Sequence, residues 1–103
     1  MLLIREIMYC KPGKVRAMVD KSLAMARLSE ETGMGKMKVM TDFCAERYWT
    51  IVTEFEVPSM QAFEAMMQGQ GITPEAAKEF DNLMKGYHDL VEYGRREIYK
   101  IET

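Results

Sequence analysis

The chain has 103 residues, of which 48% are hydrophobic and 29% are charged, and this balance predicts one globular domain spanning residues 1–103. The net charge of −2 and the mixing of basic with acidic residues argue against a nucleic-acid-binding function. The apolar run at the amino terminus is too short for a signal peptide, and no later stretch is long enough to span a membrane. We therefore expect a cytoplasmic protein without a membrane partner.

The first predicted elements are a strand over residues 2–9 and a helix over residues 14–31. Both faces of the strand are apolar apart from one charge each, Arg5 or Glu6, and this pattern is typical of a central strand covered on both sides. The helix carries an apolar stripe at the 3.6-residue period. Gly33 follows the last periodic residue and can accept the left-handed conformation that ends a helix.

Two strands are predicted next, over residues 34–43 and 48–57, joined as a hairpin by residues 44–47. Lysines on the polar side of the first of these favour a place at the sheet edge, because charged side chains discourage further pairing. The second has the clearest alternation in the chain. Its predicted core face carries Trp49, Ile51, Thr53, Phe55 and Val57, and its other face carries Tyr48, Thr50, Val52, Glu54 and Glu56.

Pro58 ends this strand, and Ser59 can cap a helix. The apolar face of that helix consists of Met60, Phe63, Met66 and Met67. Glycines at positions 69 and 71, followed by Thr73 as a second cap, predict a break and a second helical piece. The buried side of the second piece is predicted to consist of Ala76, Ala77, Phe80, Leu83, Met84, Tyr87 and Val91. A last strand is predicted over residues 92–101.

This order of elements predicts an α+β, ferredoxin-like βαββαβ fold with a four-stranded antiparallel sheet in the order 4-1-3-2. Both helical regions then lie on one face of the sheet, although the strands carry apolar residues on both. The residues expected on the uncovered face are Leu2, Ile4, Met8, Tyr48 and Val52. Since an exposed apolar face of this size would aggregate, we expect a homodimer formed sheet to sheet.

Three segments resemble the dimeric α/β-barrel superfamily, in particular its NIPSNAP-like and antibiotic-biosynthesis-monooxygenase-like branches. They are residues 11–14 after the first strand, residues 49–63 from the third strand into its helix, and residues 94–99 of the last strand. In this superfamily two such sheets face each other across a two-fold axis. The resemblance implies a cofactor-independent monooxygenase or isomerase that acts on a small apolar or aromatic metabolite. The alternative is a non-catalytic homodimer, ligand-binding or structural, of NIPSNAP-like type.

The haem-degrading relatives use an asparagine on strand one, a tryptophan on strand three and a histidine on helix two. Trp49 and His88 lie at comparable positions, but the first strand has no asparagine, which argues against haem chemistry. His88 could act as a general base beside a pocket or could simply cap a helix end. The residues predicted to line the pocket are Tyr48, Trp49, Met66, Met84 and Tyr87, with core packing as the alternative for each.

Other motifs are missing from the sequence. Cys10 and Cys44 are far apart and lack a zinc-ligand or redox spacing, and no phosphate-binding or zinc-hydrolase motif occurs. We therefore expect neither a metal nor a bound cofactor. The charged residues of the strands, Arg5, Glu54, Arg95, Arg96 and Glu97, are expected to form a ladder of ion pairs rather than a carboxylate-binding site.

Overall fold

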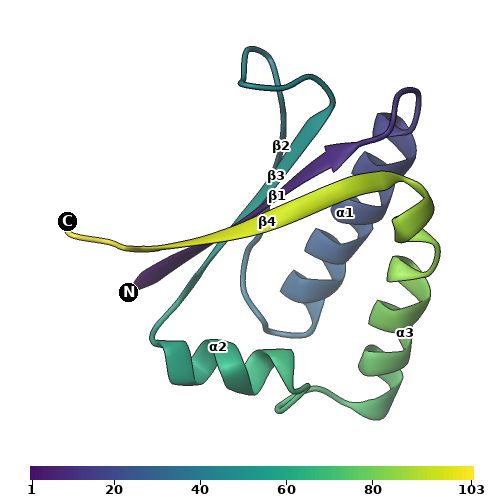
Figure 1. The fold of residues 1–103 in the computed structure, drawn as a ribbon. Coiled ribbons are helices and arrows are strands. Elements are labelled where there is room, and N and C mark those ends of the chain that lie inside the picture. The colour runs from purple at the N-terminus through teal and green to yellow at the C-terminus, as the bar shows by residue number, and fades with distance from the viewer.

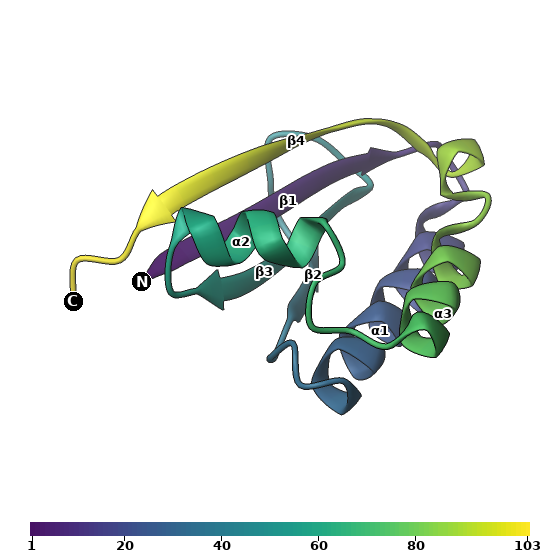
Figure 2. The same cartoon turned by 90° about the horizontal axis from the view of Figure 1, so that it is seen from below.

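The structure, a computed structural model, describes all residues from 1 to 103. Its elements are β1 (Leu2–Cys10), α1 (Val15–Glu31), β2 (Lys38–Thr41), β3 (Thr50–Val57), α2 (Met60–Met67), α3 (Pro74–Met84), a short 3₁₀ helix η1 (Tyr87–Asp89) and β4 (Val91–Lys100). The strands form one antiparallel sheet in the order β2-β3-β1-β4, open at both edges, and the helices lie on one side of it (Figures 1 and 2). The predicted ferredoxin-like fold and its strand order are confirmed.

Strand pairing decides which face of β1 meets the helices. Ile4 is opposite Phe55 and packs against Phe63 of α2, while Met8 is opposite Ile51 and packs against the cluster beneath α1. The expectation that Leu2, Ile4 and Met8 lie on the uncovered face is therefore wrong. That face of β1 carries Leu3, Arg5, Ile7 and Tyr9 instead. The error has a simple cause, because both faces of this strand are apolar and alternation cannot say which one the helices cover.

The core under the helices is divided into two parts. One cluster contains Cys10, Met18, Val19 and Ile51 and lies under α1 and α3. The other contains Ile4, Val57 and Phe63 and lies under α2, at the opposite end of the sheet (Figure 2). Only 13 of the 103 residues are buried, so the space between the two clusters is not filled by a continuous core.

The hairpin between β2 and β3 differs from the predicted one. Its strands are shorter, and the loop runs from residue 42 to residue 49. The Asp42 carboxylate accepts a hydrogen bond from the Thr50 backbone N–H at 2.9 Å, and the Thr50 hydroxyl donates to the Arg47 carbonyl at 2.8 Å. Trp49 adopts a φ of 59°, which is uncommon for a residue other than glycine. Tyr48 and Trp49 consequently lie in the loop rather than in the strand.

The second helical piece is also shorter than predicted. It ends at Met84, and Gly86 then takes a left-handed φ of 82° that turns the chain into η1. His88 and Tyr87 therefore belong to this separate turn rather than to a helix that continues to Val91. The predicted caps are confirmed, since the Ser59 and Thr73 hydroxyls each accept a backbone hydrogen bond at 3.1 Å.

The two cysteines should differ in reactivity, because Cys10 is buried and Cys44 is exposed. Burial, reinforced by the Asp42 carboxylate, raises the pKa of the Cys10 thiol and so lowers its content of reactive thiolate. We expect Ellman's reagent to label one thiol rapidly in the native protein and the second only after unfolding in guanidinium. The variant Cys44→Ser should lose the fast phase, and a fast phase that survives in it would contradict this assignment.

Candidate functional site

A cavity of about 630 Å³ lies on the helix-covered face, between the sheet and the three α-helices. It is lined by 24 residues, of which 14 are hydrophobic. Eight of the eleven methionines of the chain are among them: Met8, Met18, Met25, Met34, Met37, Met66, Met67 and Met84. Unbranched thioether side chains adapt their shape to a neighbour, so these walls can adjust to an apolar molecule.

The cavity exists because the helices cover the two ends of the sheet separately. Helix α1 packs against α3, and the Lys21 ammonium group fixes this pair by donating to the carbonyls of Leu83 at 3.0 Å and Lys85 at 2.8 Å, near the end of α3. Helix α2 packs on β3 at the other end of the sheet. The segment from residue 68 to residue 73 joins the two groups and forms part of the cavity wall through Gln68, Gly69 and Ile72.

The floor of the cavity contains one polar row across three strands. Glu6 on β1 is opposite Thr53 on β3 and Arg96 on β4, and all three line the cavity. Arg96 Nε donates a hydrogen bond to Glu6 Oε1, which makes a charged ion pair. The neighbouring rows on the same face are apolar: Phe55, Ile4 and Ile98 on one side, and Ile51, Met8 and Gly94 on the other.

The two side chains of this pair differ in their exposure to water. The side chains of Glu6 and Arg96 are 20% and 42% exposed, and the Arg96 guanidinium lies 5.1 Å from the centre of the Phe63 ring. Within the chain, Arg96 donates only through Nε, so both of its terminal amino groups are free to bind another acceptor. Because Arg96 is on the exposed side of this pair, water still screens its charge in part.

The structure places the sequence-predicted pocket residues in two regions. Met66, Met84 and Tyr87 line the cavity, whereas Tyr48 and Trp49, 80% and 46% exposed, do not. Sequence reasoning missed Glu6 as a cavity residue, although a single carboxylate on an otherwise apolar strand face was a usable signal. It also placed Arg96 in the ladder of charges on the opposite face, where the structure does not put it.

His88 lies in a second groove of about 460 Å³ along β4, and not in the cavity. Its ring stacks on Tyr87, with 4.0 Å between the ring centres. The groove and the cavity share Glu6, Met8, Tyr87 and Arg96. The charged pair therefore stands between the two spaces and is open to both.

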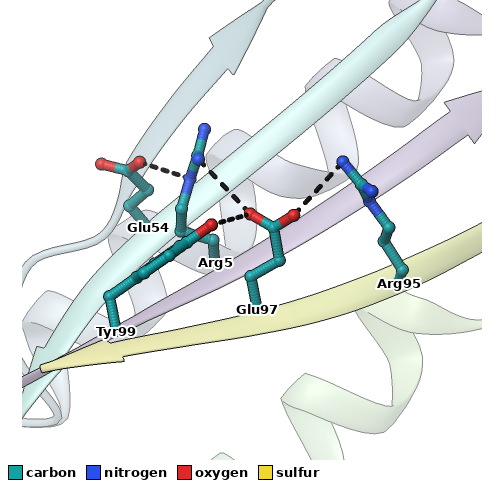
Figure 3. A network of polar contacts seen from close by, with 5 residues as sticks. All are labelled: Arg5, Glu54, Arg95, Glu97 and Tyr99. Carbon is teal, nitrogen blue, oxygen red and sulfur yellow. Dashed lines mark hydrogen bonds and ion pairs between the residues drawn. The ribbon is translucent and has the colours of Figure 1, made fainter.

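The expected ladder of ion pairs is present on the face away from the helices (Figure 3). Arg5 Nε lies 2.8 Å from Glu54 Oε2 without the alignment of a hydrogen bond, and Arg5 Nη1 lies 3.4 Å from Glu97 Oε1. Glu97 also accepts a hydrogen bond from the Tyr99 hydroxyl at 2.9 Å and lies 3.3 Å from Arg95 Nη2. Each of these carboxylates is paired with an arginine of the chain, so this network ties β3, β1 and β4 together.

The chain contains no group of three or more His, Cys, Asp or Glu side chains placed to hold a metal ion. None of the helices combines the length and the apolar character that a membrane span requires.

No protein-family model matches this chain, and no curated protein is significantly similar to it. Solved structures are similar in fold. An uncharacterised NIPSNAP domain protein from Burkholderia xenovorans has a TM-score of 0.76 at 12% identity, over 98% of this chain and 94% of that one. An antibiotic biosynthesis monooxygenase has a TM-score of 0.71 at 11% identity, over the whole of both chains. A NIPSNAP family protein from Agrobacterium tumefaciens has a TM-score of 0.70 at 12% identity, over 96% of this chain and 90% of that one. The predicted resemblance is confirmed at the level of the fold.

Two adjacent alanines of α3 test whether the cavity is open. Ala77 lines the cavity, whereas Ala76 is buried in packed surroundings and does not line it. We expect Ala76→Leu to lower the free energy of unfolding by about 1–3 kcal/mol, the usual cost of overpacking. Ala77→Leu should change it by less than about 0.5 kcal/mol, because the added atoms enter empty space. Chemical denaturation measures both values, and equal losses would mean that the space is filled.

Proposed function

We propose that this protein binds a small apolar or aromatic molecule in its methionine-lined cavity and converts it, as a monooxygenase or an isomerase, without a metal or a bound cofactor. The observation that carries the proposal is the cavity itself. Its volume of about 630 Å³ falls within the roughly 300–1,000 Å³ of typical small-molecule sites. Thioethers also make favourable contacts with aromatic rings. The likeness to an antibiotic biosynthesis monooxygenase supports the activity by analogy of fold alone.

The predicted residues have distinct roles in this proposal. Met66 on α2 and Met84 on α3 contribute to the cavity wall, and Tyr87, the first residue of η1, also lines it. His88 supports Tyr87 through ring stacking, since it lies outside the cavity. Tyr48 and Trp49 belong to the exposed loop between β2 and β3, where they are available for contact with a second copy of the chain.

We also propose that the working form is a homodimer joined through the uncovered face of the sheet. The support is that one face has no helices, although it carries Leu3, Met40 and Val52 together with the ladder of ion pairs. Removing apolar surface from water stabilises an assembly by about 25 cal/mol per Å². A two-fold contact brings the same surface of both copies together, so the positive and negative ends of the ladder can meet their opposites.

A second candidate function is a non-catalytic homodimer, ligand-binding or structural. The observation in its favour is that His88, the residue predicted to act as a base, is exposed and does not line the cavity. This candidate shares the cavity and the dimer with the first and differs only in the absence of a chemical step.

Binding can be measured with N-phenyl-1-naphthylamine, an uncharged aromatic probe that fluoresces in apolar sites. We expect saturable binding to the wild-type protein and about tenfold weaker binding to Ala77→Phe, a loss of about 1.4 kcal/mol, because the new ring narrows the cavity. The control Trp49→Phe should bind within about twofold of wild type, because Trp49 does not line the cavity. Absence of saturable binding to the wild-type protein would refute the proposal.

The dimer is tested by light scattering coupled to size exclusion. We expect twice the chain mass of 11.9 kDa for the wild-type protein. Val52→Glu places a charge on the uncovered face and should give the monomer mass, because an unpaired charge is costly to bury in an interface. The matched control Lys78→Glu, on the exposed side of α3, should stay dimeric. A monodisperse wild-type monomer would contradict the proposed assembly.

A further inference from the structure

The polar row on the cavity floor has a composition that packing alone does not require. On a sheet face that helices partly cover, a charged pair is seldom more favourable than apolar side chains of the same size. Apolar side chains could take the place of this pair, because the rows on either side of Thr53, Glu6 and Arg96 contain isoleucine, phenylalanine and methionine. The pair is also the one place where a carboxylate and a guanidinium face this apolar cavity together.

The geometry of the pair leaves both partners with binding capacity toward the cavity. Glu6 receives one charged hydrogen bond, from Arg96 Nε, and its second carboxylate oxygen has no donor within the chain. Arg96 retains two terminal amino groups that can donate to an oxygen. A ligand oxygen bound to these groups would lie close to the Glu6 carboxylate, with the apolar body of the ligand against the methionines.

We infer that Glu6 and Arg96 form a proton-transfer site for an apolar ligand that carries an enolisable carbonyl group. The inference rests on the proposed function, because it requires that a ligand enters the cavity. The Glu6 carboxylate removes a proton from the carbon next to the carbonyl, and the electrons of that C–H bond form a C=C bond. The electrons of the C=O π bond move to the oxygen, which becomes an enolate held by the Arg96 amino groups.

The step is balanced without an oxidant or a co-reactant. The negative charge moves from Glu6 to the enolate oxygen, so Arg96 has an anionic partner before and after the transfer. The carboxyl proton of Glu6, which is 20% exposed, exchanges with solvent, and Glu6 then delivers a solvent-derived proton to the same carbon, which exchanges the hydrogen, or to a conjugated carbon, which moves the double bond. The second outcome is an isomerisation. Arg96 stabilises the enolate through charge-assisted hydrogen bonds from its terminal amino groups.

The experiment uses 2-tetralone, an apolar aromatic ketone with acidic hydrogens beside its carbonyl. Displacement of N-phenyl-1-naphthylamine reports its binding, and ¹H NMR in deuterated buffer reports loss of the C1 hydrogen signals above the buffer rate. We expect the wild-type protein to accelerate this exchange. Glu6→Gln should lower the protein-catalysed rate roughly 100-fold, within the range for loss of a general base. Arg96→Met should lower it by a similar factor, as expected for loss of an oxyanion donor.

The matched control is Glu54→Gln. Glu54 is also a carboxylate paired with an arginine, but it lies on the opposite face of the sheet. We expect this variant to leave the exchange rate within about twofold of wild type. Glu6→Asp keeps the charged pair but withdraws the carboxylate by one methylene, so it should still bind the naphthylamine and exchange about tenfold more slowly. This variant keeps the test valid if Glu6→Gln does not fold.

The outcomes separate this inference from the proposed function. Binding of 2-tetralone without accelerated exchange, or exchange at the wild-type rate in either folded Glu6 variant, overturns the inference and leaves the binding proposal standing. Binding of the naphthylamine without displacement by 2-tetralone also overturns the inference alone. Failure of the wild-type protein to bind the naphthylamine overturns both.

Discussion

The arrangement of this protein depends on a carboxylate in the middle of its central strand. Glu6 faces the helices, where an unpaired charge would be costly to bury, and Arg96 on the neighbouring strand provides the compensating charge. Helices that closed tightly over this pair would remove its remaining hydration. The apolar residues instead gather into one cluster under α1 and α3 and another under α2, and the cavity lies between them.

The same strand places consecutive opposite charges on opposite faces of the sheet. Arg5 meets Glu54 and Glu97 on the uncovered face, and Glu6 meets Arg96 on the covered one. A slip of one residue in the pairing would move Arg5 among the helices and put Glu6 outside. Both charges would then lose their partners, so the two networks together specify the register that also forms the cavity floor.

The methionines explain how a cavity of this size is compatible with a small domain. Their flexible side chains can spread over the cavity walls from the sheet, the helices and the connecting segments, where rigid branched side chains would need a closer fit. The result is an apolar cleft, open to solvent on one side, with adaptable walls and one charged row on its floor. Such a combination orients a ligand at one end and tolerates variation in the shape of the rest.

Local features were determined by the sequence by itself, because their causes lie within a few residues. Alternation of apolar and polar residues predicted the strand that ends at Val57, and the hydroxyls of Ser59 and Thr73 predicted where α2 and α3 begin. The helical period of apolar residues predicted that Met66 and Met84 face inward. Only the tertiary structure decided which face of β1 the helices cover and that Glu6 meets Arg96, since the pairing of β1 with β4 joins residues far apart in the chain. The tertiary structure also decided that Trp49 and His88 lie outside the cavity. Trp49 falls in the loop that the hydrogen bond between Asp42 and Thr50 holds, and His88 falls in the turn that follows the left-handed Gly86.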